Sequence, residues 1–239
     1  MGRVETKNGY NRGLLFNVHH GREHNTKCDS KPQQPTARKF PMTINYYFAP
    51  HSPWSYLGHQ RFADMAARSG ATVRLLPTDL SKVFPVSGGL PLGQRAPQRQ
   101  AYRLVELKRF SEHLRLPMNI KPKFFPVAGD DACRLILAVE QANGVSAAMA
   151  LTGALMRAVW AEERNIADAA TLAALLTEQG STAVRLDEAK SPAVQQRYEA
   201  IAQQAIDAAV FGAPSYVIDG EIFWGQDRLN FVEAKLAAK

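Results

Sequence analysis

The chain has 239 residues, of which 46% are hydrophobic and 21% charged, a composition typical of a globular protein that buries a full core. Its formal net charge is +7, but residues 1–41 hold eight Lys or Arg against three Asp or Glu, which leaves only +2 for the other 198 residues. A nearly neutral body without basic clusters among aromatic residues argues against nucleic acid as a partner. No apolar run reaches the roughly 18 residues of a membrane-spanning helix, so we expect no membrane insertion.

Residues 1–41 show no sustained hydrophobic period, and their longest apolar run is too short for a secretory signal. We expect this segment to be a disordered leader, or an artefact of an upstream start or of expression. Its potential metal ligands are His19, His20, His24 and Cys28. Their spacing matches no metal-binding pattern, so we predict no metal site. The other cysteine is Cys133, and so few cysteines fit a reducing, cytoplasmic setting.

The first predicted element is a strand at residues 44–48, a β-branched and aromatic run that Pro50 ends. A helix follows, with Ser52 as its N-cap and Pro53 at its first position, and the free N–H groups there stabilise an anion. Thioredoxin-like redox proteins carry Cys-x-x-Cys at such a junction, whereas this chain has Ser52 and Ser55 at the same spacing. Serines form no disulfide, but the junction could hold an external thiolate, with glutathione the obvious one. The alternative is that Ser-Pro is merely a good helix start.

A second strand is predicted at residues 72–77, parallel to the first in a right-handed β-α-β unit. The Gly- and Pro-containing residues 78–96 are expected to form a loop, and residues 116–127 an irregular connection. Helices are expected at residues 97–115, from Asp130, from a Ser146 cap to Trp160, from Asp168 to Gly180, and from Ser191 to Ala209.

The chain is predicted to end in a hairpin and a helix. Strands at residues 215–218 and 221–224 flank Asp219-Gly220, a type I′ turn signal, and Asp227 or its neighbour caps a final helix through Leu236. Removing the helical middle leaves β-α-β followed by β-β-α, which predicts an α/β fold of the thioredoxin type. We expect a thioredoxin-like domain of residues 42–96 and 210–239 and an all-helical insertion domain of residues 97–209. The site is expected in the cleft between them.

Two further motifs belong to the thioredoxin-like part. Ala213-Pro214 immediately precedes the third strand, so Pro214 marks an edge, a cis peptide or an ordinary strand entry. A cis peptide would leave the Ala213 backbone free to pair with an extended peptide. Gln226 and Asp227 could hold an α-amino and a carboxylate group, although a simple N-cap role for Asp227 is the alternative.

In the helical insertion, a Pro-rich segment combines cations with aromatic rings at Lys121, Lys123, Phe124 and Phe125. Such a wall suits an aromatic acid, because the rings contact its ring system and the ammonium groups its carboxylate. Arg95 and Arg99 would add positive field. Taken singly, the Phe pair is as well explained by the core and the lysines by solvation.

Together these motifs resemble the 2-hydroxychromene-2-carboxylate isomerases, which belong with the kappa-class glutathione transferases in the DsbA-like branch of the thioredoxin fold. The resemblance covers residues 43–238. The motifs that carry it are Ser52-Pro53-Trp54-Ser55-Tyr56, the segment from Lys121 to Pro126, Val159-Trp160, Phe211-Gly212-Ala213-Pro214 and the segment from Phe223 to Arg228.

The resemblance implies a glutathione-dependent isomerase that interconverts 2-hydroxychromene-2-carboxylate and an open-chain hydroxybenzylidenepyruvate-type acid. It would act as a cytoplasmic homodimer on a small aromatic carboxylate. Ser52 would stabilise the glutathione thiolate and serve as the catalytic residue. The other implied contacts are Ala213 and Pro214 for the cysteinyl unit of glutathione, Gln226 and Asp227 for its γ-glutamyl end, and Lys121, Lys123, Phe124, Phe125 and Trp160 for the substrate.

The chain departs from the family pattern in two places. It has Ala49-Pro50-His51 where relatives carry Asp-Phe before the serine, and Phe124 and Phe125 do not match the expected tyrosine and asparagine. Substrate identity is therefore open. A kappa-like glutathione transferase acting on another electrophile and a non-catalytic, peptide-binding DsbA-like protein are the two alternatives.

Overall fold

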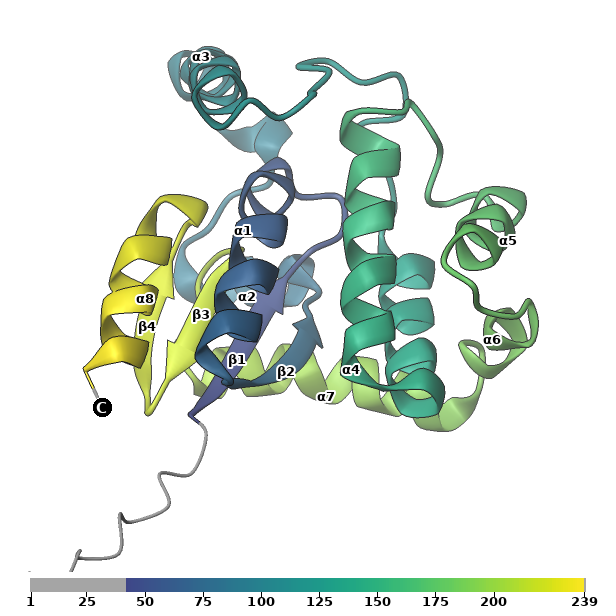
Figure 1. The fold of residues 1–239 in the computed structure, drawn as a ribbon. Helices are drawn as coiled ribbons and strands as arrows, with labels where there is room; N and C mark the ends of the chain where they lie inside the picture. Colours follow the sequence, from purple (N-terminus) through teal and green to yellow (C-terminus); the bar gives the residue numbers. More distant parts are fainter. Residues whose placement is uncertain (1–41, 239) are drawn as a thin grey trace, which may run out of the picture. The chain divides into compact units, whose positions relative to one another are not determined.

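The computed structural model describes residues 42–238, so the predicted leader lies outside the described residues. Four strands form one mixed sheet in the order β2-β1-β3-β4 (Figure 1). Strand β1 (Thr43–Phe48) pairs in parallel with β2 (Thr72–Pro77) and antiparallel with β3 (Ser215–Ile218), which pairs antiparallel with β4 (Glu221–Trp224). The predicted β-α-β and β-β-α units are confirmed, and they share a single sheet.

Helix α1 (Pro53–Ser69) forms for the reasons visible in the sequence. Ser52 caps it, Pro53 opens it, and Gly70 ends it in the left-handed conformation at φ 65°. Its apolar face packs on the sheet, where Phe62 lies 4.5 Å from Tyr46 and 4.8 Å from Tyr216 between ring centroids. This aromatic cluster packs the middle of α1 against β1 and β3.

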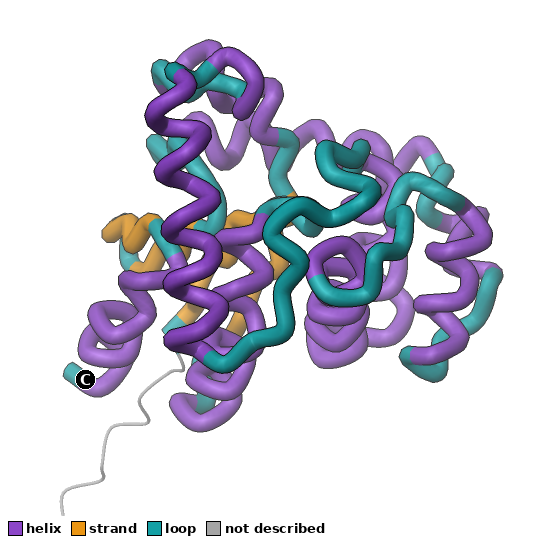
Figure 2. The backbone as a smooth tube through the Cα atoms, turned by 90° about the horizontal axis from the view of Figure 1, so that it is seen from above, coloured by secondary structure: helices purple, strands orange, loops and turns teal. Residues whose placement is uncertain are grey.

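The other helices cover the sheet or lie to one side of it. Figure 1 shows α1 and α8 on one face of the sheet and α7 on the other. The remaining elements are α2 (Leu80–Ser87), α3 (Pro97–Leu114), α4 (Asp130–Trp160), α5 (Ala169–Glu178), α6 (Val184–Glu188), α7 (Pro192–Asp207), α8 (Leu229–Ala237) and the 3-10 turns η1 (Leu92–Gln94) and η2 (Gln226–Arg228). Figure 2 shows the irregular connection between α3 and α4 as a long loop, as predicted.

Helix α4 joins the two helices that were predicted from Asp130 and from Ser146. The break between them is at Gly144, whose φ of 84° and ψ of 171° are not helical. By length and composition α4 could span a membrane, with a mean hydropathy of 1.3 over its most apolar 18 residues. In the described part of the chain it packs against β2 and the helices α1, α5, α6 and α7, which accounts for its apolar composition.

Residues 78–96 and one short helix differ from the predictions. Residues 78–96 contain α2 and η1 rather than a continuous loop, because Asp79 accepts a hydrogen bond from Ser81 N at 2.9 Å and starts a short helix despite Pro85. The short helix α6 was not predicted. Asp227 lies within η2, and its neighbour Arg228, the other predicted alternative, occupies the N-cap position of α8 without a side-chain capping hydrogen bond.

Candidate functional site

The start of α1 forms the centre of the site. Ser52 Oγ accepts a hydrogen bond from Ser55 N at 3.3 Å, and the Ser52 backbone N–H donates to Ala49 O at 2.9 Å. Ser52 is only 8% exposed, whereas Ser55 is fully buried. Ser52 therefore presents its hydroxyl at the positive end of a 17-residue helix, where a nearby anion is stabilised.

A cavity of about 610 Å³ opens beside Ser52. Segments distant in the chain form its wall: the start of α1, α2, the residues around η1, the first part of α3, and the turn before β3. Of the predicted residues it contains Ser52, Ala213 and Phe125, together with Arg95 and Arg99. The cavity is lined by His51, Ser52, Pro53, Trp54, Leu80, Phe84, Ser87, Gly88, Gly89, Leu90, Leu92, Arg95, Ala96, Arg99, Arg103, Phe125, Phe211, Gly212, Ala213 and Trp224.

The turn before β3 brings its backbone to this cavity. The Ala213-Pro214 peptide is cis, one of the alternatives that the sequence left open. Gly212 and Ala213 line the cavity, whereas Pro214 is buried and its carbonyl accepts a hydrogen bond from Gly225 N at 2.9 Å. An extended ligand beside Ser52 would thus meet the Ala213 backbone.

Gln226 and Asp227 do not line this cavity. Gln226 is only 2% exposed, and its Oε1 accepts a hydrogen bond from Arg61 Nη1 at 3.0 Å. Asp227 is exposed and bonded to Arg228. Their predicted role toward an amino acid end of a ligand stays a prediction.

Only part of the predicted substrate wall lines the cavity. Phe125 lines the cavity, and Trp160, which is fully buried, supports it with ring centroids 4.8 Å apart. The Trp160 indole N–H also donates to His51 O at 3.3 Å. Lys121 and Lys123 are exposed, and Lys123 Nζ lies 5.2 Å from the ring of Phe124. These two lysines and Phe124 lie outside the cavity wall, so the cations that line it are arginines instead.

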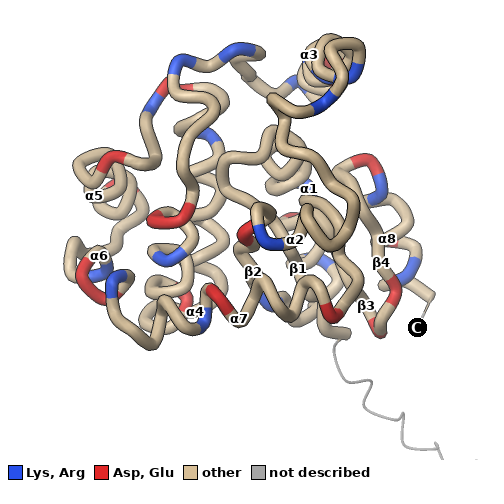
Figure 3. Tube along the Cα trace, turned by 180° about the vertical axis from the view of Figure 1, so that it is seen from behind, with Lys and Arg blue, Asp and Glu red and all other residues tan. Residues whose placement is uncertain are grey.

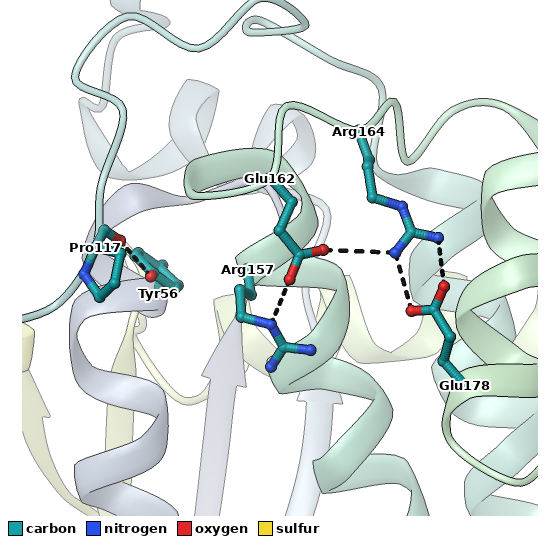
Figure 4. Close-up of polar contacts among 6 residues, drawn as sticks. All are labelled: Tyr56, Pro117, Arg157, Glu162, Arg164 and Glu178. Carbon is teal, nitrogen blue, oxygen red and sulfur yellow. Dashed lines mark hydrogen bonds and ion pairs between the residues drawn. The ribbon is translucent and has the colours of Figure 1, made fainter.

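Polar contacts tie the connection before α4 to α1, and the segment after α4 to α4 and α5 (Figure 4). The Tyr56 hydroxyl of α1 donates to Pro117 O at 2.6 Å. At the end of α4, Arg157 Nε pairs with Glu162 at 2.6 Å and Arg164 pairs with Glu178 at 2.9 Å. Arg164 also holds the pKa of the Glu178 carboxyl below its usual range. These contacts fix the end of α4 that presents Trp160.

His51, which belongs to the segment that departs from the family pattern, is a site residue. It lines the cavity beside Ser52, and its Nδ1 is enclosed without a hydrogen-bond partner among the described residues. Burial lowers the pKa of His51, while Asp130 and Asp79 raise it by a smaller amount. We therefore expect a neutral imidazole at pH 7, next to the hydroxyl at the helix start.

Gly129 makes room for this imidazole. A Cβ at residue 129 would lie 2.3 Å from His51 Nδ1, closer than any normal contact. Gly129→Ala is expected to destabilise the fold by about 1–3 kcal/mol through overpacking. Urea unfolding measures this loss. In a protein that already carries His51→Ala, the imidazole is gone, so adding Gly129→Ala should cost much less stability than it does in the parent. A Gly129→Ala protein as stable as the parent would contradict the placement of His51.

The site has no thiol of its own in the described part of the chain. Cys133, the one cysteine among residues 42–238, is buried in α4, and burial raises the pKa of its thiol. Ser52 and Ser55 occupy the two positions of a thioredoxin-type Cys-x-x-Cys pair. Dithiol–disulfide exchange by this junction is therefore excluded, whereas binding of a thiolate from outside is compatible with it.

Comparisons with known proteins agree with this geometry. Residues 43–237 match the family model of the DsbA-like thioredoxin domain. A 2-hydroxychromene-2-carboxylate isomerase from Sphingobium xenophagum is 30% identical over 81% of this chain and 97% of its own length. A solved structure of 2-hydroxychromene-2-carboxylate isomerase superposes with a TM-score of 0.70 at 26% identity and covers 82% of this chain and 95% of that one. Human glutathione S-transferase kappa 1 is 24% identical over 83% of this chain and 92% of its own length. The chain belongs to the DsbA-like thioredoxin-domain family and, within it, to the 2-hydroxychromene-2-carboxylate isomerases.

Proposed function

We propose that the protein is a glutathione-dependent isomerase that interconverts 2-hydroxychromene-2-carboxylate and an open-chain hydroxybenzylidenepyruvate-type acid. The observation that carries the proposal is Ser52, a nearly buried hydroxyl at a helix N-terminus, beside a cavity large enough for a ligand and in a family named for this isomerase. The name of the kappa-class relative supports glutathione as the thiol. We expect the enzyme to act in the cytoplasm and as a homodimer.

Ser52 is proposed to hold the thiol of glutathione in its ionised form. Lowering a thiol pKa from about 8.5 to near 7 corresponds to roughly 2 kcal/mol of differential stabilisation. A hydrogen bond from a hydroxyl to a charged group contributes about 1.5–3 kcal/mol, and a helix N-terminus about 0.3–1 kcal/mol. The Ser52 hydroxyl and the start of α1 can together supply this stabilisation without a general base.

The remaining residues would position the two ligands. Bound glutathione would supply a thiolate that adds reversibly to a conjugated double bond, which permits rotation about that bond without net oxidation or reduction. The Ala213 backbone would pair with the peptide part of glutathione, and Gln226 and Asp227 would contact its γ-glutamyl end. Phe125, supported by Trp160, would pack against the aromatic ring of the substrate.

The test of this function is calorimetric titration of glutathione into the full-length protein, with S-methylglutathione as the comparison. Glutathione is expected to bind with a Kd in the micromolar to low millimolar range, and methylation is expected to weaken binding because it removes the thiolate. Turnover of 2-hydroxychromene-2-carboxylate then separates the isomerase from a glutathione transferase that acts on another electrophile. Absence of glutathione binding would contradict the proposal and favour a peptide-binding protein.

A further inference from the structure

Three arginines lie along one side of the cavity. Arg99 and Arg103 are one turn apart on α3, and Arg95 lies two residues before the first residue of that helix. All three line the main cavity. The spacing of four residues places Arg99 and Arg103 on one face of α3, and Arg95 precedes the helix in extended backbone; Figure 3 shows basic residues on α3. We call Arg95, Arg99 and Arg103 the arginine row.

The arginine row has no carboxylate partner among the described residues 42–238. No aspartate or glutamate lines the main cavity. Most other arginines of the described chain are paired with carboxylates, namely Arg68, Arg109, Arg134, Arg157, Arg164, Arg185, Arg197 and Arg228. Glu106 lines the adjoining cavity but is paired with Arg109 at 2.7 Å, so within the described chain the row is a concentration of positive charge without an ion-pair partner of its own.

Contacts of another kind hold two of these guanidinium groups in place. Arg103 Cζ lies 5.2 Å from the ring centroid of Phe125 and 5.8 Å from that of Trp160. Arg95 Nε donates to Leu90 O at 2.8 Å. Burial and the neighbouring Arg95 lower the pKa of Arg103 to about 10. Arg95 and Arg103 are thus held in place and partly desolvated, whereas Arg99 is exposed, and an anionic ligand would relieve the repulsion among the three charges.

A second cavity of about 350 Å³ adjoins the row. It shares Trp54 and all three arginines with the main cavity. Its other lining residues are Gln98, Tyr102 and Glu106. The arginine row therefore borders two cavities, so a ligand that begins beside Ser52 can extend past the guanidinium groups.

We propose that the isomerase prefers a dianionic relative of 2-hydroxychromene-2-carboxylate, a conjugated aromatic 2-oxo acid with a second carboxylate remote from the 2-oxo acid end, bound by the arginine row. This proposal rests on the proposed function. One carboxylate is satisfied by a single bidentate guanidinium, so a monocarboxylate leaves most of the row unpaired. A second carboxylate at the far end of an elongated substrate would reach the rest of the row. The Ser52 hydroxyl and the start of α1 hold the thiolate, and the carboxylates of glutathione are the competing occupants of the row that the test must separate from the substrate.

The test compares naphthalene-2-carboxylate with naphthalene-2,6-dicarboxylate by calorimetric titration into the full-length protein, with and without saturating glutathione. We expect the dicarboxylate to bind about tenfold more tightly or better, since each charge-assisted pair adds affinity. Arg103→Gln and Arg99→Gln should each reduce that preference several-fold. Arg99→Gln removes a charge of the row without touching the Phe125 ring, so it tests the row even if Arg103→Gln perturbs the packing there. Lys108→Gln is the control, because it removes one charge from the same helix outside both cavities.

Equal affinity for the two acids, or an equal loss in Lys108→Gln and the row variants, would overturn the proposal. A loss of glutathione affinity in the row variants with the dicarboxylate preference unchanged would assign the row to glutathione instead and would also overturn it. Neither result contradicts the isomerase. Conversely, a parent protein that prefers the dicarboxylate but binds no glutathione would support the dianion site and contradict the proposed function.

Discussion

Replacement of Ser52 by alanine is expected to lower isomerase turnover at pH 7 by about tenfold or more. The variant loses the hydroxyl that stabilises the thiolate, and a thiol pKa that returns to about 8.5 leaves only a few per cent of the thiol ionised at neutral pH. Turnover should recover in part near pH 9, where the thiol ionises without help. Steady-state kinetics from pH 6.5 to 9.5 measure both effects.

Two other serines serve as controls for this experiment. Ser191 caps α7 as Ser52 caps α1, with a proline at the first helical position and a hydrogen bond from Val194 N to its Oγ at 3.4 Å. Ser191→Ala removes a comparable cap, at a cost of about 1 kcal/mol in stability, away from the cavity and should leave turnover unchanged. Ser55→Ala tests the buried hydroxyl one turn further into α1. A loss of turnover in Ser55→Ala as large as that in Ser52→Ala would contradict the assignment of Ser52 as the residue that stabilises the thiolate.

Acid is expected to destabilise the fold through His59. This residue of α1 is 4% exposed, and burial lowers its pKa to about 4 although the hydrogen bond to Met149 O raises it. The Met149 carbonyl only accepts, so His59 Nε2 donates to it at 2.9 Å and Nδ1 accepts from the Tyr46 hydroxyl at 3.3 Å. The neutral imidazole therefore has both nitrogens satisfied, and protonation would disrupt the contact with Tyr46.

The size and pH window of this effect follow from the two pKa values. In the unfolded chain His59 titrates near 6.5, so below that pH the unfolded state binds a proton that the folded state does not. Stability from this residue is complete above pH 6.5 and is lost as the pH falls toward 4, by roughly 3 kcal/mol in total. Urea unfolding of the parent and of His59→Gln from pH 7.5 to 4.5 measures it. Indistinguishable pH dependence in the two proteins would contradict the prediction.

The sequence was sufficient wherever local chemistry decides the structure. Ser52 and Pro53 start α1 as predicted, and Asp219 and Gly220 both adopt positive φ in the hairpin between β3 and β4. Helix α2 was missed because Pro85 and the following glycines suggested a loop. The Asp79 cap and the apolar spacing of Leu80, Val83 and Phe84 were the signals that could have found it.

The composition of the cavity depends on contacts that the sequence does not display. Gln226 is absent from the cavity lining, and its side chain is bonded to Arg61, which lies 165 residues away in the chain. Phe124 and Phe125 are adjacent, yet only Phe125 reaches the cavity. Arg103 was not predicted as a site residue. Its four-residue spacing from Arg99 was visible, but its lack of a carboxylate partner appears only in the structure.

The absence of a cysteine at the start of α1 affects how the enzyme would respond to oxidants. Ser52 and Ser55 cannot be oxidised to a disulfide or a sulfenic acid, and Cys133 is shielded within α4. If the reacting thiol belongs to glutathione, an oxidant modifies the bound ligand, which can dissociate, and the protein itself stays unmodified. The catalyst would then be renewed by ligand exchange, and its rate would follow the cellular supply of reduced glutathione.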